Sequence, residues 1–154
     1  MSEPVSTAGP TERVAGFRFG MRCRVDLADT DLGAVVYYAR YPLYLDRGVI
    51  EYRRHLGIPP LGPEGHLFVV ASLSVDYRSS ARFDDEVEVL VRVPEIRRSS
   101  HLVEARMERV DGEDATLLAA MRCTIVGVST YEAGGRPSRV PEEMRAAVDG
   151  FEGR

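Results

Sequence analysis

A stripe of apolar residues begins at Tyr41 and recurs at helical spacing over sixteen residues: Tyr41, Leu45, Val49, Tyr52 and Leu56. Steps of three and four residues place these side chains on one face, so the stripe predicts an amphipathic helix. Pro42 fits the first turn of that helix, where a missing N–H costs no hydrogen bond. The Gly and Pro residues at 57–60 end it. It is the only long helix that the sequence predicts.

Alternation of apolar and polar residues predicts five strands, one before this helix and four after it. Their ranges are 17–28, 66–77, 86–96, 101–110 and 115–129. In the second of them we expect one face to carry Leu67, Val69, Ala71, Leu73, Val75 and Tyr77. One helix cannot cover both faces of a five-stranded sheet, so we predict an α+β domain that is an obligate oligomer.

The composition is that of one globular domain, with 44% hydrophobic and 29% charged residues among 154. Residues 1–14 are expected to be a flexible tail, residues 15–130 the domain, and residues 131–154 an extension with a short helix at 141–148. No apolar run is long enough to cross a membrane, and the first residues lack the features of an export signal. We therefore expect a cytoplasmic protein with no membrane partner.

Charge and residue usage exclude several kinds of chemistry. The protein has a net charge of -4, whereas a general nucleic-acid binder carries an excess of basic residues, so no nucleic-acid partner is expected. The chain contains no lysine, which excludes Schiff-base and pyridoxal chemistry. The three histidines and two cysteines have no zinc-site spacing, so we expect no metal. Cys23 and Cys123 are interpreted as small buried hydrophobes, with a bridge between them left open.

Asp29 and Asp31 lie in the loop that precedes the predicted helix. In isolation such residues are typical of turns and helix caps. A helix start also offers unpaired N–H groups and the positive end of the helix dipole, which can polarise a bound carbonyl. A carboxylate beside that carbonyl could attack it or activate water.

The segment Asp29-Thr30-Asp31-Leu32-Gly33-Ala34-Val35-Val36-Tyr37-Tyr38-Ala39-Arg40-Tyr41 resembles the signature of the 4-hydroxybenzoyl-CoA thioesterase family of the hotdog superfamily. A second segment, Val75-Asp76-Tyr77-Arg78 through Phe83-Asp84-Asp85-Glu86-Val87, resembles the family's strand-turn-strand region. The resemblance extends from about Phe17 to Val128. It implies a hotdog fold, a curled five-stranded antiparallel sheet around one long central helix, and active sites between the subunits of a homodimer or of a tetramer built as a dimer of dimers.

The family's functional residues carry over to particular positions. The resemblance places the catalytic carboxylate on Asp31, as nucleophile or as general base, and the group that polarises the thioester carbonyl on the backbone N–H of Tyr38. Arg97, Arg98 and Ser99 correspond to a stretch that meets the phosphates of coenzyme A. Tyr37 and Tyr41 are packing aromatics that could line the acyl pocket. Ala34 stands where the family commonly has glycine, so a positive backbone torsion there would be strained.

The resemblance implies an acyl-CoA thioesterase that releases a free acid and CoA from an aryl, short or medium acyl group, with no cofactor. Two alternatives stay open. One is release from acyl carrier protein in polyketide or fatty-acid metabolism, with Arg97 and Arg98 facing the carrier. The other is an acyl-CoA-binding protein that does not hydrolyse its ligand.

Overall fold

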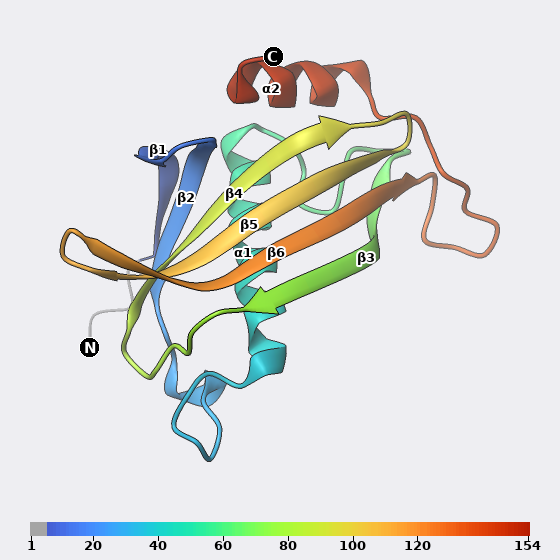
Figure 1. The fold of residues 1–154 in the computed structure, drawn as a ribbon. Helices are drawn as coiled ribbons and strands as arrows, with labels where there is room; N and C mark the ends of the chain where they lie inside the picture. The colour runs from blue at the N-terminus through green and yellow to red at the C-terminus, as the bar shows by residue number, and fades with distance from the viewer. Residues whose placement is uncertain (1–5) are drawn as a thin grey trace.

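The computed structural model describes residues 6–154 and contains one antiparallel sheet that curls around a central helix (Figure 1). The strands lie in the order β1-β2-β4-β5-β6-β3. Their bounds are β1 Thr7–Val14, β2 Phe17–Arg24, β3 Leu67–Tyr77, β4 Glu86–Ile96, β5 Ser100–Asp111 and β6 Asp114–Val128. The helices are α1 Tyr41–His55 and α2 Glu142–Glu152, with short 3-10 turns at η1 Leu27–Asp29 and η2 Tyr38–Arg40. The predicted α+β architecture is confirmed.

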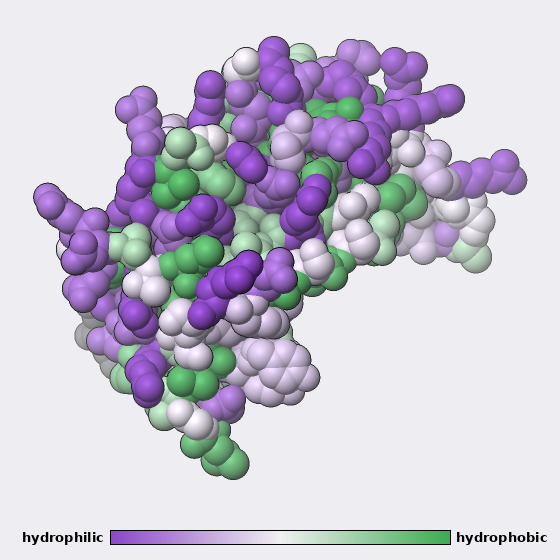
Figure 2. All heavy atoms as spheres, viewed as in Figure 1, coloured by the Kyte–Doolittle hydropathy of each residue, from purple (hydrophilic) through white to green (hydrophobic). Residues whose placement is uncertain are grey.

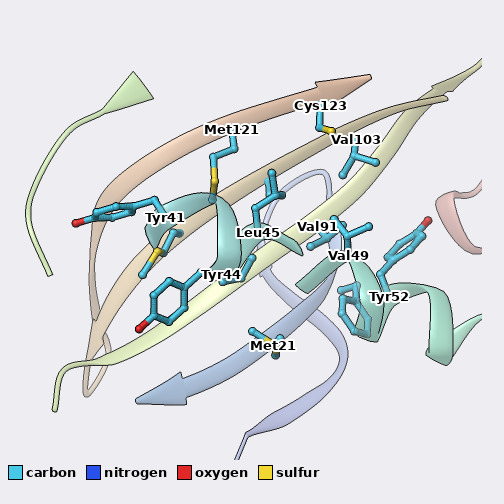
Figure 3. Packing of buried hydrophobic residues seen from close by; sticks show 14 of the residues in the cluster. Met21, Tyr41, Tyr44, Leu45, Val49, Tyr52, Val91, Val103, Met121 and Cys123 are labelled. Atoms are coloured by element: carbon cyan, nitrogen blue, oxygen red, sulfur yellow. The ribbon is translucent and has the colours of Figure 1, made fainter. Parts of the chain in front are cut away.

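Helix α1 packs its apolar stripe against the concave face of the sheet (Figure 3). Tyr41, Leu45, Val49 and Tyr52 are each 5% exposed or less. Gly48 brings the helix close to β4, because a Cβ at this position would lie 2.7 Å from a methyl group of Val89. The helix is therefore held against the middle of the sheet, with its first turn at one end of the molecule.

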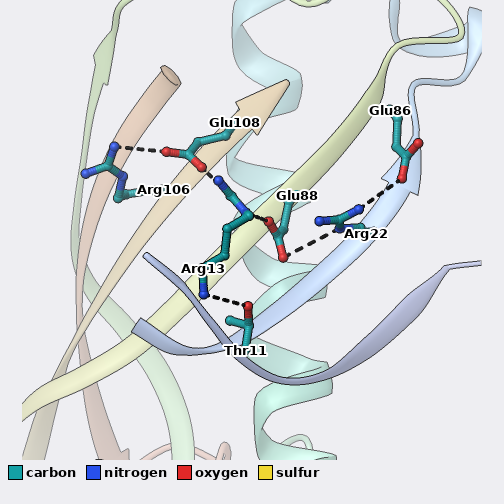
Figure 4. Close-up of polar contacts among 7 residues, drawn as sticks. All are labelled: Thr11, Arg13, Arg22, Glu86, Glu88, Arg106 and Glu108. Atoms are coloured by element: carbon teal, nitrogen blue, oxygen red, sulfur yellow. Dashed lines mark hydrogen bonds and ion pairs between the residues drawn. The ribbon is translucent and has the colours of Figure 1, made fainter. Parts of the chain in front are cut away.

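The sequence predicts five strands, but the described residues form six, because residues 7–14 of the predicted tail form β1. This strand pairs with β2 and is mostly exposed, so its apolar pattern is weak. Its anchor is Arg13, which binds the buried carboxylates of Glu88 and Glu108 on β4 and β5 (Figure 4). Such a contact joins residues far apart in the sequence, so the local pattern could not predict it. The prediction for residues 1–5 lies outside the described residues.

Strand β3 is an edge strand, and within residues 6–154 it is paired with β6 alone. The expected common face of 67–77 is wrong for its first half, because the register shifts between Val70 and Ser72. Val70 lies opposite Ile125 and Leu73 opposite Cys123, and both of these β6 partners belong to the core. Val70 and Leu73 thus share the face toward α1, yet they are 63% and 43% exposed.

The C-terminal extension returns along the sheet and covers one end of it with α2 (Figure 1). The helix ends at Glu152 rather than at the predicted residue 148, and it buries Met144 and Val148. The Glu152 carboxylate accepts hydrogen bonds from the Tyr52 hydroxyl at 2.7 Å and from the Val93 N–H at 2.8 Å. These contacts tie α2 to α1 and β4.

Candidate active site

Asp31 lies on a closed, exposed loop directly before η2 and α1. The loop is held at its base by a bridge between Thr30 and Val36, and the Asp31 N–H donates to the Val35 carbonyl at 2.9 Å. One oxygen of the Asp31 carboxylate, Oδ1, accepts from the Gly33 N–H at 2.7 Å. Oδ2 makes no hydrogen bond within residues 6–154, which leaves it available to a ligand or to water.

The tip of this loop carries apolar atoms at the surface (Figure 2). Leu32 is fully exposed, and Ala34 adopts a φ of 60°. The loop therefore retains at Ala34 the left-handed geometry that glycine adopts without strain. An exposed apolar tip and a strained backbone are typical of a functional segment rather than of a simple connection.

Asp29 has a structural environment different from that of Asp31. Its Oδ2 accepts from the Tyr44 hydroxyl at 2.5 Å, and its carbonyl accepts from the Tyr37 N–H at 2.9 Å. Burial, and then the hydrogen bond to Asp29, raise the pKa of Tyr44 well above its usual value. Asp29 thus fixes the loop to α1, whereas Asp31 projects from it.

The Tyr38 N–H lies at the start of η2, which continues directly into α1. The turn and loop hydrogen bonds of the described chain use the N–H groups of Tyr37 and Arg40 but not that of Tyr38. The Tyr38 carbonyl accepts from the Tyr77 hydroxyl at 2.8 Å, and the Tyr77 ring packs edge-on against Tyr38 and Tyr41. The structure therefore places Tyr37, Tyr38 and Asp31 in one loop, with Tyr41 buried beneath them.

A groove of about 310 Å³ runs along α1 beside β3. It begins at Pro42, in the first helical turn, and its walls are largely apolar. On the helix it is lined by Pro42, Leu45, Asp46, Val49, Ile50 and Arg53. A groove of this size that starts one turn from the Tyr38 N–H is suited to a small apolar chain.

Arg53 in this groove was not among the predicted site residues. It follows Val49 by four residues and so lies on the same side of the helix as the stripe, next to Tyr52, which was the signal available in the sequence. The side chain is 8% exposed, and its Nη1 donates to the Pro60 carbonyl at 2.6 Å. Its guanidinium lies 4.3 Å from the centre of the Phe68 ring.

Arg97, Arg98 and Ser99 form the turn between β4 and β5, at the opposite end of the sheet from Asp31. The Val25 N–H, near the Asp31 loop, donates a hydrogen bond to the carbonyl of Asp85, which directly precedes β4. From there β4 extends for eleven residues, roughly 35 Å, to the Arg97–Ser99 turn. Arg97 is ion-paired with Glu95 at 2.9 Å. One chain therefore does not bring this turn and Asp31 together.

The structure also shows the state of the two cysteines, the placement of side chains that could bind a metal ion, and the character of the helices. Cys23 and Cys123 are free and buried. Within residues 6–154, no group of three or more His, Cys, Asp or Glu side chains is placed to hold a metal ion. No helix in this part of the chain has the length and apolar character needed to span a bilayer.

Solved structures with the same fold show the class of protein to which this chain belongs. The fold matches a mutant 4-hydroxybenzoyl-CoA thioesterase complexed with 4-hydroxybenzoyl-CoA, with a TM-score of 0.76 at 21% identity over 84% of this chain and 96% of that one. A thioesterase from Thermus thermophilus complexed with coenzyme A and Zn is 32% identical, with a TM-score of 0.76 over 92% and 99% of the two chains. The chain has the hotdog fold, and its class is that of the thioester hydrolases.

The family follows from the sequence itself. Residues 25–148 match the thioesterase-like superfamily. An acyl-CoA thioesterase of Haemophilus influenzae, YbgC, is 35% identical over 136 residues, which are 86% of this chain and 93% of that protein. The chain belongs to the thioesterase-like superfamily, and the resemblance seen in the Asp31 loop is confirmed.

Proposed function

We propose that this protein hydrolyses acyl-CoA thioesters to a free acid and CoA, with Asp31 as the catalytic carboxylate. The observation that carries the proposal is a free carboxylate oxygen and an unused N–H group in one loop at the start of α1. The acyl-CoA thioesterase relative from Haemophilus influenzae and the coenzyme A complex of the Thermus relative support the choice of substrate.

The thioester carbonyl oxygen would accept the Tyr38 N–H, where the dipole of α1 favours the negative charge that develops on that oxygen. Asp31 Oδ2 then either attacks the carbonyl carbon or removes a proton from the water that attacks it. In the first route the carbon–sulfur bond breaks as a mixed anhydride with Asp31 forms, and water then hydrolyses the anhydride to release the acid and restore the carboxylate. In the second route water adds to the carbonyl carbon directly and the carbon–sulfur bond breaks. In both routes one proton of the water leaves with the thiol. Tyr37 and Tyr41 precede Pro42, where the groove begins, along the chain, and neither side chain is part of its lining.

A second copy of the chain would complete the site. Val70 and Leu73 face the α1 side of the sheet from an edge strand, where they line the groove and are still 63% and 43% exposed. We propose that β3 pairs with β3 of a second copy, which would give the joined sheets of the dimer that the resemblance implies. An antiparallel partner would also offer the far end of its own sheet to the Asp31 end of this one. That arrangement allows the partner's Arg97–Ser99 turn to approach the CoA phosphates.

The decisive experiment measures thiol release from acyl-CoAs by wild type and Asp31→Asn. We expect Asp31→Asn to lower kcat/KM by about a hundredfold or more while binding of acyl-CoA persists. Asp29→Asn is the matched control, because it should reduce stability through Tyr44 and affect turnover less. Full activity in Asp31→Asn would overturn the mechanism.

The same assay separates the alternatives. Wild type that binds acyl-CoA across aryl, short, medium and long chains but releases no thiol would be a binding protein. Turnover that is strong on acyl carrier protein and weak on CoA esters would identify the carrier as the partner instead.

A further inference from the structure

The acyl groove contains one buried charge. Its lining is apolar except for Asp46 and Arg53 on α1 and exposed backbone. Asp46 is exposed at the rim of the groove, whereas Arg53 is more than nine-tenths buried and forms part of the wall. The two side chains therefore differ in what they offer to a bound acyl group, and only Arg53 offers a charge inside the groove.

The Arg53 guanidinium is fixed in position but is not neutralised. The Pro60 carbonyl holds Nη1, and the Phe68 ring supports one face of the group. Within residues 6–154 no carboxylate lies within ion-pair distance of it, and Nε and Nη2 make no hydrogen bond. Neither of these two nitrogens is fully buried, and the Arg53 side chain lines the groove. Two donors in a rigid fork are thus left for a ligand.

The charge persists at neutral pH. Burial lowers the pKa of Arg53 to about 10, and the charge of Asp46 partly opposes that change. The neighbouring His101 is neutral, because burial lowers its pKa to about 3. A buried cation without a counter-ion is costly, and a bound anion would relieve that cost.

We propose that Arg53 recognises an anionic group at the far end of the acyl chain, so that the preferred substrates are ω-carboxyacyl thioesters. The inference rests on the proposed thioesterase function and names its substrate class. The groove begins at Pro42 in the first turn of α1 and reaches Arg53 eleven residues later, a rise of roughly 16 Å along the helix. An apolar chain could lie between these ends, with its thioester at the start of α1 and its carboxylate at Arg53.

The test compares thiol release from two series of CoA esters matched in length. Succinyl-, adipoyl-, suberoyl- and sebacoyl-CoA form the carboxylate series, and butyryl-, hexanoyl-, octanoyl- and decanoyl-CoA form the methyl series. At the best length, wild type should show a kcat/KM about ten- to a hundredfold higher for the carboxylate ester, as expected for a charged hydrogen bond. Arg53→Leu should lose this preference and still hydrolyse the methyl series, and Arg53→Lys should retain part of it.

Arg54→Leu is the matched control, because Arg54 is exposed on the same helix and is ion-paired with Glu51. It should keep the wild-type preference. A merely structural role for Arg53 would lower both series in proportion, and that result would overturn the proposal. A wild type that prefers the methyl series at every length would also overturn the proposal. That result does not depend on whether the Arg53 variants fold.

Failure of the thioesterase assignment gives a different outcome. If wild type hydrolyses neither series and none of the aryl and long-chain esters of the assay above, the proposed function is wrong, and calorimetric binding of suberoyl-CoA and octanoyl-CoA then tests recognition alone. Tighter binding of suberoyl-CoA that Arg53→Leu abolishes supports the role of Arg53. Equal affinities overturn it.

Discussion

Ala34 holds a backbone conformation that its own side chain disfavours. Its φ of 60° lies in the left-handed region, where a residue with a Cβ pays roughly 1–2 kcal/mol. Glycine avoids this cost but loses more chain entropy on folding, so Ala34→Gly should raise the free energy of unfolding by up to about 1 kcal/mol. Urea denaturation of the two proteins measures the difference.

The control for this substitution is Ala39→Gly, in the 3-10 turn η2 that follows the same loop. Only the entropy cost applies there, so stability should fall by about 0.5–1 kcal/mol. If both glycine variants lose stability equally, the strain assigned to Ala34 does not exist. The Ala34 variant also shows whether thiol release depends on the fixed shape of the Asp31 loop.

Among the elements, α1 and the four strands after it follow from the sequence because their patterns are local. The apolar stripe and the alternating runs need only neighbours a few residues away. β1 could not be found in this way, because its anchor is the distant contact between Arg13 and the carboxylates of Glu88 and Glu108. The bulge in β3 could not be predicted either. One extra residue moves the following side chains to the opposite face of the sheet, and the composition of the strand does not change.

Within the candidate site, the residues of a local motif could be predicted from the sequence, and a residue placed by distant contacts could not. Asp31 and Tyr38 belong to a contiguous motif that resembles a known family. Arg53 owes its place in the groove to Pro60 and Phe68, which reach it from other segments of the chain. Its position four residues after Val49 is visible in the sequence, but only the tertiary contacts show that it is buried and that no carboxylate of residues 6–154 is paired with it.

The edge strand β3 provides a test of oligomerisation at the level of one element. A charge on its uncovered apolar face should oppose pairing with a second copy, so Val70→Glu is expected to shift the protein toward monomer. Light scattering or sedimentation at several concentrations measures the mass. Ser74→Glu is the control, because Ser74 pairs with Arg122 rather than with a core residue. A wild type that is already monomeric would contradict the proposed pairing.

At the scale of the whole molecule, the buried histidines couple stability to pH. The unfolded chain protonates His101 near its ordinary pKa of 6.5, whereas burial lowers the folded pKa to about 3. The unfolded state therefore binds more protons across this interval. The free energy of unfolding consequently decreases as the pH falls through it, by at most about 1.4 kcal/mol per pH unit for one such group. Burial lowers the pKa of His66 as well, which acts in the same direction.

Removal of His101 should flatten this dependence. His101→Leu keeps an apolar side chain beside Phe68 and removes a ring nitrogen that has no hydrogen-bond partner in the described chain. We expect similar stability at neutral pH or above and a smaller loss in mild acid, measured by urea denaturation at a series of pH values. The comparison isolates His101, because the carboxylates contribute equally to both curves. Parallel curves would show that His101 gains its proton as readily in the folded protein as in the unfolded chain, and the neighbour of Arg53 would then become charged in mild acid.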